Sequence, residues 1–375
     1  MNVLHVYRTY FPDSQGGLEE CIRQICHNTQ PLGAESRVLT LSRNATPDVL
    51  TRPEAEVHRF PLTWEASSNG VSIEAWFKFH ELSEWADVVH YHFPWPFADL
   101  MHLRHRPGSA TVLTYHSDIV RQQLLSRWYR PVMDRFLQRM DRIVATSPAY
   151  ATTSPVLNRL ARKVSVIPIG LDAASYPSVP EDELKRAHAA AKFYFLFIGV
   201  LRYYKGLHIL LDAVAGTDLD LVIVGSGPLD RELRQEVARR KARNVRFLGH
   251  VSDREKVALI KGCAALVLPS HLRSEGFGIS LLEGAMYGRP LISTELGTGT
   301  SYVNAHHKTG IVVPSGDAHM LREAMVYLAH HPEAAENMGA AAHERYQRLF
   351  TGKVMGESYY KLYREIVDAG GTAHR

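Results

Sequence analysis

The sequence predicts an α/β protein with two doubly wound, Rossmann-like domains, and three observations support that prediction. The chain has 375 residues, more than one hydrophobic core of ordinary size supports. Its composition, 45% hydrophobic and 22% charged, is that of a globular protein. Short apolar, β-rich runs alternate with stretches of helical period from end to end, a pattern that predicts parallel sheets covered by helices on both faces.

The alternation can be followed along the chain. In the first half, the expected strands lie at residues 3–7, 37–41, 88–91, 111–115, 143–146 and 164–167. Apolar residues at helical spacing predict helices between them, at residues 19–29, 74–84, 98–104 and 126–140, and we expect Pro131 to divide the last into two. The second half repeats the rhythm, with expected strands at residues 193–199, 219–224, 245–248, 265–268, 290–293 and 310–313.

The two halves meet in a loop that contains Pro177 and Pro180. We therefore expect an N-terminal domain of residues 1–172 and a C-terminal domain of residues 173–375, facing each other across a cleft. The stretch 359–367 has helical period and is free to pack back on the N-terminal domain. Ligands of such sheets bind beyond the carboxyl ends of the strands.

Charge and cysteine content exclude several classes of function. Lys and Arg number 43 against 39 Asp and Glu, a net charge of +4 that is too small to indicate nucleic-acid binding. The three cysteines fit neither a disulfide framework nor a zinc site. Apolar runs are far shorter than the ~20 residues of a spanning helix, and the first residues read as a strand rather than a signal peptide. We expect a reduced, cytosolic protein.

The most informative segment runs from Glu275 to Glu283, between an expected buried strand and a helix. Its glycine-rich turn consists of Gly276, Phe277, Gly278 and Ile279. Such a turn allows backbone N–H groups and a helix N-terminus to face an anion. The two carboxylates suit polyhydroxylated groups, because each accepts hydrogen bonds from sugar hydroxyls. The alternative is a plain helix start at which acidic residues are favoured by the helix dipole.

Two cations follow another expected strand. Arg202 and Lys205 lie just beyond the strand that ends at Gly199, where a guanidinium and an ammonium can neutralise a diphosphate. The alternative is a solvated basic turn. Near the amino end, Gly16 and Gly17 open a helix and allow close approach to a phosphate. The third glycine of the dinucleotide pattern is absent, so a nicotinamide cofactor is disfavoured.

Histidines mark the first domain. His116 comes just after an expected buried strand, and its position there raises it above the other histidines as a candidate. His90 and His92 alternate at strand period, so both rings can share one face. They could form part of a metal pair, but the sequence supplies no third ligand nearby, and buried structural histidines are the alternative.

The segment from Ile119 to Ile143 is basic and amphipathic, with arginines interleaved among aliphatic and aromatic residues. Such a stretch could lie on an anionic membrane surface. The alternative is an ordinary helix that covers the core with one face and is solvated on the other.

With these residues identified, the chain resembles the retaining, nucleotide-sugar-dependent glycosyltransferases of family four, which share the GT-B fold of two facing Rossmann-like domains. The family's landmarks appear in its order: the glycine loop at Gly16 and Gly17, the acceptor-side histidine at His116, the phosphate pair at Arg202 and Lys205, and the E-x7-E motif at Glu275 and Glu283. Together they are specific, although each is weak alone.

Longer stretches are similar to the bacterial mannosyltransferases that build O-antigens, at residues 4–13, 115–120, 202–210, 270–275 and 297–301. This resemblance implies GDP-mannose or GDP-rhamnose as donor and a lipid-diphosphate-linked glycan as acceptor, with no cofactor and no metal. One departure is Ser301, which stands where many family members carry a glutamate.

The resemblance also implies a role for each residue. Glu283 would hold the ribose and Glu275 the transferred sugar, while Arg202 and Lys205 stabilise the departing diphosphate. Backbone amides at Gly17, Phe277 and Gly278 would assist, and His116 would orient the sugar rather than attack it. Other functions on this fold stay open: a sugar-nucleotide epimerase, a glycan phosphorylase, or a silent nucleotide-sugar-binding subunit.

Overall fold

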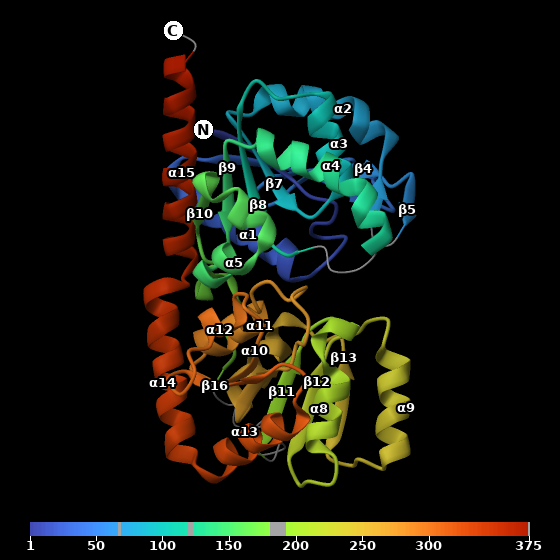
Figure 1. Ribbon diagram of the computed structural model, residues 1–375, viewed down its shortest axis with the longest axis vertical. Coiled ribbons are helices and arrows are strands. Elements are labelled where there is room, and N and C mark those ends of the chain that lie inside the picture. Colours follow the sequence, from blue (N-terminus) through green and yellow to red (C-terminus); the bar gives the residue numbers. More distant parts are fainter. Residues whose placement is uncertain (67–68, 119–122, 181–192, 374–375) are drawn as a thin grey trace. The chain divides into compact units, whose positions relative to one another are not determined.

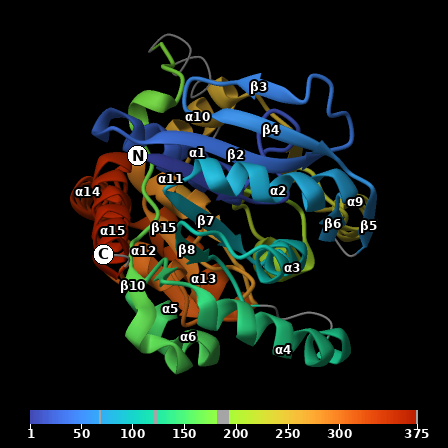
Figure 2. The same ribbon diagram turned by 90° about the horizontal axis from the view of Figure 1, so that it is seen from above.

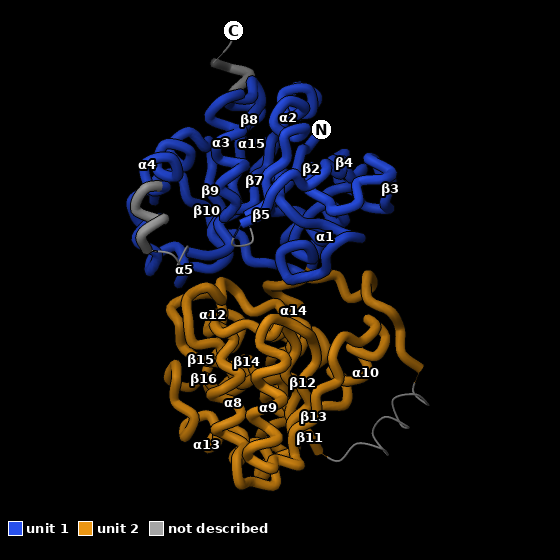
Figure 3. Tube along the Cα trace, turned by 90° about the vertical axis from the view of Figure 1, so that its right-hand side faces the viewer, with its two compact units in different colours: residues 1–170, 352–375 blue, residues 171–351 orange. Residues whose placement is uncertain are grey.

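The computed structural model describes residues 1–66, 69–118, 123–180 and 193–373. The chain forms two compact units (Figure 3). Unit 1 consists of residues 1–170 and 352–375, and unit 2 of residues 171–351. The sequence placed the boundary after residue 172 and left the final helix free to join the first domain. Each unit contains its own parallel sheet and its own hydrophobic core.

The sheet of unit 1 has eight strands in the order β10-β9-β8-β7-β1-β2-β4-β3, parallel except for β3. Its strands are β1 (Asn2–Val6), β2 (Glu35–Ser42), β3 (Val49–Thr51), β4 (Glu56–Pro61), β7 (Val88–Phe93), β8 (Ala110–Tyr115), β9 (Arg142–Ala145) and β10 (Val164–Val166). A separate hairpin pairs β5 (Trp64–Ala66) with β6 (Asn69–Val71). Strand β4 was not predicted, because its run of six residues is half polar and includes the buried Arg59.

Helices cover both faces of this sheet (Figure 2). They are α1 (Gly17–Thr29), α2 (Ile73–Trp85), α3 (Pro96–Arg104), α4 (Gln123–Arg139), α5 (Pro148–Thr153), α6 (Pro155–Arg159) and α15 (Gly352–Ala373). Because side chains alternate along a strand, Leu4 and Val6 pack toward α2 and α3, whereas Tyr7 packs toward α1. The final helix, α15, packs along α1 in unit 1.

The prediction that Pro131 divides the helix over residues 126–140 was wrong. The structure has one helix, α4, with Pro131 inside it. A proline in a helix removes one hydrogen bond and costs about 3 kcal/mol. The second half of α4 offsets that cost by burying Met133, Phe136 and Leu137 in the core of unit 1.

Unit 2, whose strands β11, β12, β13 and β16 are labelled in Figure 1, has a six-stranded, wholly parallel sheet. The strand order is β13-β12-β11-β14-β15-β16. Its strands are β11 (Tyr194–Ile198), β12 (Asp220–Val224), β13 (Val245–Gly249), β14 (Ala265–Leu268), β15 (Leu291–Glu295) and β16 (Gly310–Pro314). Its helices are α8 (Leu207–Val214), α9 (Asp230–Arg240), α10 (Asp253–Gly262), α11 (Ile279–Met286), α12 (Thr300–Val303), α13 (Ala318–His330) and α14 (Pro332–Leu349). The expected strands of both halves are confirmed to within two residues at each end.

Candidate active site

The sheet of unit 2 reverses its winding between β11 and β14. β11 pairs with β12 on one side and with β14 on the other, so the connections that leave β11 and β14 turn to opposite faces. This strand order is that of dinucleotide-binding sheets, whose ligands lie beyond the carboxyl ends of the strands at the reversal. Lys205 follows β11 and Glu275 follows β14. The two predicted residues therefore meet at this reversal, which is the switch point of the sheet.

Lys205 and Glu275 form a close ion pair. The Nζ of Lys205 lies 2.5 Å from Oε2 of Glu275, and the hydroxyl of Ser270 donates to the same oxygen at 2.9 Å. Glu275 is 7% exposed, so the ammonium balances a carboxylate almost removed from water. Burial acts to lower the pKa of Lys205, but the Glu275 carboxylate outweighs burial and the pKa is raised. Lys205 therefore keeps its positive charge at neutral pH.

The loop that carries Lys205 is shaped by a short 3-10 turn, Tyr203–Lys205. Gly206 follows the turn at a φ of +71°, where a Cβ would lie 2.0 Å from the carbonyl oxygen of Pro269. Glycine at this position thus lets the loops after β11 and β14 approach each other. Arg202 stands before the turn, is exposed, and acts to lower the pKa of Lys205. Both predicted cations lie in one loop.

The predicted glycine-rich turn leads into α11. Gly278 is the N-cap residue at a φ of +88°, and no side chain caps the helix. The first backbone N–H groups of a helix have no partner within it and favour an anion beyond the end. Phe277 is buried and packs edge-on against Phe350, with ring centroids 6.0 Å apart. Gly276 is buried as well, and Ile279 is half-buried.

Glu283 lies one turn into α11 and is 5% exposed. Its Oε1 is 2.9 Å from Nζ of Lys256 and accepts a hydrogen bond of 3.2 Å from the hydroxyl of Tyr176. Burial acts to lower the pKa of Lys256, but the carboxylates of Glu283 and Asp253 together reverse that effect and the pKa is raised. Lys256 and Tyr176 were not predicted as site residues, because they come from α10 and from the start of unit 2 and belong to no local motif.

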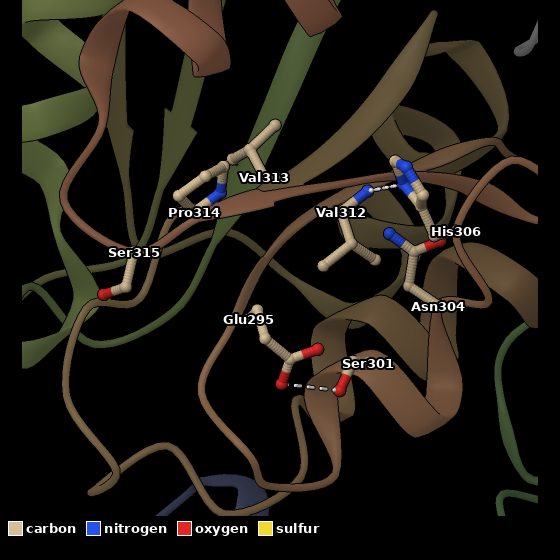
Figure 4. Close-up of a pocket in the computed structure, with 8 residues that line it drawn as sticks. All are labelled: Glu295, Ser301, Asn304, His306, Val312, Val313, Pro314 and Ser315. Atoms are coloured by element: carbon tan, nitrogen blue, oxygen red, sulfur yellow. Dashed lines mark hydrogen bonds between the residues drawn. The ribbon is translucent and has the colours of Figure 1, made fainter.

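An open pocket of about 720 Å³ lies in unit 2 beside the departure from the family pattern (Figure 4). Glu295, Ser301 and His306 line it together with the end of β16. The hydroxyl of Ser301 donates to Oε1 of Glu295 at 3.0 Å, and the backbone N–H of Gly297 donates to the same oxygen at 2.7 Å. Glu295 thus ties the loop after β15 together through its own carboxylate.

In unit 1, the predicted glycines lie where they were expected along the chain. Gly16 is the N-cap of α1 and Gly17 its first residue. The buried carboxylate of Glu19 folds back over this N-terminus, because a Cβ on Gly16 would lie 2.7 Å from Oε2 of Glu19. The hydroxyl of Ser14 donates to the other oxygen at 2.7 Å. A carboxylate therefore already interacts with the positive end of α1.

His116 lies just beyond β8 and is 6% exposed. Its Nε2 is 3.0 Å from Nδ1 of His92. Burial lowers the pKa of His116 to about 3, so the ring is neutral at physiological pH. A neutral imidazole offers one donor and one acceptor, which suits contact with a sugar hydroxyl.

His90 and His92 do lie on one face of the sheet, with ring centroids 4.3 Å apart. The sequence supplies no third ligand near them, but the fold brings in a histidine from another strand. His5 on β1 is placed beside them by the pairing of β1 with β7, and ring nitrogens of all three histidines lie within 4.8 Å of one another. The third histidine is distant in sequence, so no spacing pattern could reveal it.

The segment predicted as basic and amphipathic corresponds largely to α4. Its first four residues, 119–122, lie outside the described residues. In the described part, Met133, Phe136 and Leu137 are buried in the core, whereas Arg130 and Arg135 are exposed. Among the described helices, none combines the length and the apolar character needed to cross a membrane.

Comparison with known proteins defines the class. Residues 15–175 match the family described as Glycosyltransferase Family 4, and residues 179–345 match the family described as Glycosyl transferases group 1. The two matches meet close to the boundary between the two units. The chain is a glycosyltransferase with two Rossmann-like sheets of the GT-B fold, as the fold prediction and the E-x7-E resemblance indicated.

Individual relatives agree with that class. The chain is 51% identical to the D-rhamnosyltransferase WbpZ of Pseudomonas aeruginosa, over 94% of this chain and 92% of the relative. It is 43% identical to the O-antigen chain mannosyltransferase C of Escherichia coli, over 98% of this chain and all of the relative. A solved structure of Anabaena HepE with UDP-glucose has a TM-score of 0.79 at 19% identity, covering 97% of this chain and all of HepE. The chain belongs to glycosyltransferase family 4, and the predicted resemblance to O-antigen glycosyltransferases is confirmed.

Proposed function

We propose that this enzyme transfers D-rhamnose or D-mannose from a GDP-sugar to a lipid-diphosphate-linked glycan in O-antigen synthesis, with retention of the anomeric configuration. The observation that carries the proposal is the near full-length similarity to a D-rhamnosyltransferase and an O-antigen mannosyltransferase. A nucleotide sugar as donor is supported further by the UDP-glucose complex of the structural relative HepE.

In the proposed donor complex, Lys205 and Arg202 bind the diphosphate. The Lys205 ammonium already lies at the switch point, and Arg202 shares its loop. The uncapped N-terminus of α11 adds backbone N–H groups from the turn that contains Phe277 and Gly278. Preorganised donors of this kind contribute about 3 to 4 kcal/mol each when charge develops on a leaving group. These fixed positive groups supply the charge stabilisation that the departing diphosphate requires.

The carboxylates of unit 2 bind the sugars in this proposal. Glu275 accepts hydrogen bonds from the transferred hexose, and Glu283 from the ribose. Both are buried and each already accepts hydrogen bonds from a lysine and a hydroxyl-bearing residue, so their oxygens are fixed before the donor arrives. In unit 1, His116 offers a ring nitrogen to a sugar hydroxyl. A phosphate that binds near Gly16 and Gly17 would have to displace the carboxylate of Glu19 from the N-terminus of α1.

The reaction we propose is a front-face displacement. The bond between the anomeric carbon and the diphosphate oxygen breaks as the bond to the acceptor hydroxyl oxygen forms on the same face. The proton of that hydroxyl passes to an oxygen of the departing diphosphate, so that GDP leaves. No enzyme nucleophile takes part, in contrast to retaining glycoside hydrolases, which use a pair of carboxylates.

The test is GDP release by the purified enzyme from GDP-rhamnose and GDP-mannose, with and without a lipid-diphosphate-linked glycan. Release that requires the glycan supports the proposal. Isomerised donor without acceptor would indicate an epimerase, a requirement for inorganic phosphate a phosphorylase, and binding without turnover a silent subunit. Lys205→Ala and Arg202→Ala should each lower kcat about 100-fold or more. Lys78→Ala, an exposed lysine of α2, is the matched control and should leave kcat unchanged.

We also propose that α4 holds the enzyme against the anionic surface on which a lipid-linked acceptor lies. Met133, Phe136 and Leu137 of its described part are buried in the core, whereas Arg130 and Arg135 are exposed. The contact would therefore be electrostatic, through these two arginines, and sensitive to salt. Vesicles that contain anionic lipid should co-sediment with the enzyme at low salt and release it at high salt. Equal binding to neutral and anionic vesicles, or none to either, would contradict the contact.

A further inference from the structure

Three histidines of unit 1 form a continuous hydrogen-bonded chain, of which the proposed function uses only the outer member. His5 lies on β1, His92 on β7 and His116 just beyond β8. The Nδ1 of His5 is 3.1 Å from Nε2 of His92, and the Nδ1 of His92 is 3.0 Å from Nε2 of His116. Successive rings are stacked, with centroids 5.4 and 5.3 Å apart and interplanar angles of 24°.

All three rings are neutral. Burial lowers the pKa of His5 and of His116 to about 3, and burial together with the neighbouring histidines lowers the pKa of His92 well below its ordinary value. A neutral imidazole carries a proton on one of its two ring nitrogens. Each contact between rings therefore needs one nitrogen with a proton and one without.

Counting protons leaves two arrangements for the chain. If His92 donates through Nδ1, then His116 accepts at Nε2 and carries its proton on Nδ1, while His5 must donate through Nδ1. If His92 donates through Nε2, then every ring carries its proton on Nε2 instead. Mixed arrangements would require a doubly protonated or doubly deprotonated His92. The three rings therefore share one tautomer.

The two ends of the row of three histidines differ in their hydrogen bonds and in their access to water. At the inner end, Nε2 of His5 is buried and has no hydrogen-bond partner among the described residues. At the outer end, Nδ1 of His116 makes no hydrogen bond within the described part of the chain. The inner end is closed to water, so a proton cannot leave there. A ligand can therefore contact the row of histidines only at Nδ1 of His116, and the shared tautomer decides whether that nitrogen donates or accepts a hydrogen bond.

A metal-binding site is the alternative interpretation of this cluster, because nitrogens of His5, His90 and His92 lie within 4.8 Å of one another. Both nitrogens of His90 are already bonded, at 2.7 Å to the Tyr363 hydroxyl and at 2.7 Å to the Thr114 hydroxyl. Both nitrogens of His92 are bonded to other histidines. A metal would have to displace these bonds in a site without a carboxylate ligand, so the hydrogen-bonded chain is the better account.

We propose that His5 and His92 are positioning residues that fix the tautomer of His116, so that its Nδ1 has a single hydrogen-bonding character toward a substrate hydroxyl. The inference rests on the proposed role of His116. The new element is that the role of His116 toward a sugar hydroxyl depends on the buried rings of His5 and His92, which contact no substrate. His90 serves as an internal comparison, because it is buried beside the chain but bonded to Tyr363 and Thr114.

The first test is independent of activity. Nitrogen-15-labelled histidine in the full chain, observed by long-range proton–nitrogen correlation at pH 7, reports the tautomer of each ring. We expect His5, His92 and His116 to share one tautomer, whichever nitrogen carries the proton. Different tautomers on His92 and His116 would overturn the proposal. A shift of these signals on addition of one equivalent of Zn²⁺ would also overturn it, in favour of a metal site.

The second test uses a matched pair. When asparagine replaces histidine, its side-chain amide group occupies about the position of Nδ1. The longer side chain of glutamine places its amide group near the position of Nε2. His92→Asn therefore keeps the contact to His116, whereas His92→Gln keeps the contact to His5. We expect kcat of His92→Gln to be at least tenfold below that of His92→Asn at similar KM for the donor. Equal kcat values would mean that His92 is merely structural.

Two further variants complete the design. His90→Gln disturbs the same core and should change the melting temperature without changing the tautomer of His116. If the His92 variants do not fold, His5→Phe keeps a ring at the inner end and removes its hydrogen bond. His116 should then populate both tautomers, and an unchanged single tautomer would refute the coupling. A further outcome is that the tautomers behave as expected in an enzyme that does not turn over GDP-sugars. That result would contradict the proposed function but would support the hydrogen-bonded coupling of the three histidines.

Discussion

Each carboxylate of the unit 2 site is balanced by a half-buried lysine from another element. Glu275 pairs with Lys205 and Glu283 with Lys256. Coulomb attraction in a partly desolvated site holds each carboxylate in place, but it also means that a bound diphosphate must share Lys205 with Glu275. The consequence is that Lys256, a residue outside any motif, holds the carboxylate of the motif residue Glu283 in place.

At the residue scale, Lys256→Met should destabilise unit 2 and weaken donor binding. The change leaves the Glu283 carboxylate buried without its cation, which costs about 3 kcal/mol, the lower end for a buried pair because Lys256 is 20% exposed. Urea unfolding and the KM for the donor measure the two effects. Adding Glu283→Gln to the variant should recover part of the stability but not the donor affinity. Recovery of both would contradict the proposed ribose contact.

The buried histidines predict how stability depends on pH. His5 and His116 have pKa values of about 3 in the folded chain, against about 6.5 when unfolded. Between these values the unfolded chain binds more protons, so the free energy of unfolding falls as the pH drops below about 6.5, by up to about 1.4 kcal/mol per pH unit for each histidine. Urea midpoints at pH 7.5, 6.0 and 5.0 should decrease in that order. His5→Phe should flatten the decrease, and a constant midpoint would refute the burial argument.

At the scale of elements, the loops after β11 and β14 are brought together by one glycine. Gly206→Ala should cost more than a backbone effect alone, because the new Cβ would lie 2.0 Å from the Pro269 carbonyl oxygen. Gly216→Ala is the matched control, since Gly216 has nearly the same φ, +70° against +71°, with nothing within 4 Å of its Cβ. The control should cost about 1 kcal/mol. Equal losses in urea unfolding for the two variants would show that the loops do not need this close approach.

Whether a site residue can be predicted from the sequence depends on the secondary-structure element that carries it. Lys205 and Glu275 were predictable because each follows a strand, and the carboxyl ends of neighbouring parallel strands meet. Lys256 and Tyr176 were not, because they reach Glu283 from helix α10 and from the loop that begins unit 2, and neither position follows from strand order. His5 was missed for a related reason: the adjacency of β1 and β7 depends on the whole sheet order, which short-range periodicity does not contain. The continuity of α4 through Pro131 likewise depends on packing rather than on propensity.

At the scale of the whole molecule, the last helix belongs to the first unit. One side of α15 is buried there, including Met355, Leu362 and Ile366. The hydroxyls of Tyr359 and Tyr363 form hydrogen bonds with Thr114 and His90 at 2.8 and 2.7 Å. The chain end thus stabilises the sheet face that carries the histidine chain, while unit 2 ends at residue 351. Because units with separate cores open separately, stability should be lost in one unit at a time.

The double variant Tyr359→Ala, Tyr363→Ala in the full chain should therefore destabilise unit 1 selectively. Removing two buried aromatic side chains costs about 3 to 5 kcal/mol each, so amide exchange in β7 and β8 should accelerate at least 100-fold, while β11 and β12 keep their protection. Tyr359→Phe with Tyr363→Phe keeps the rings and removes two hydrogen bonds, and should cost only about 1 kcal/mol per bond. Equal acceleration in both sheets would show that the two units unfold as one, and unchanged exchange in β7 and β8 would show that α15 contributes little to unit 1.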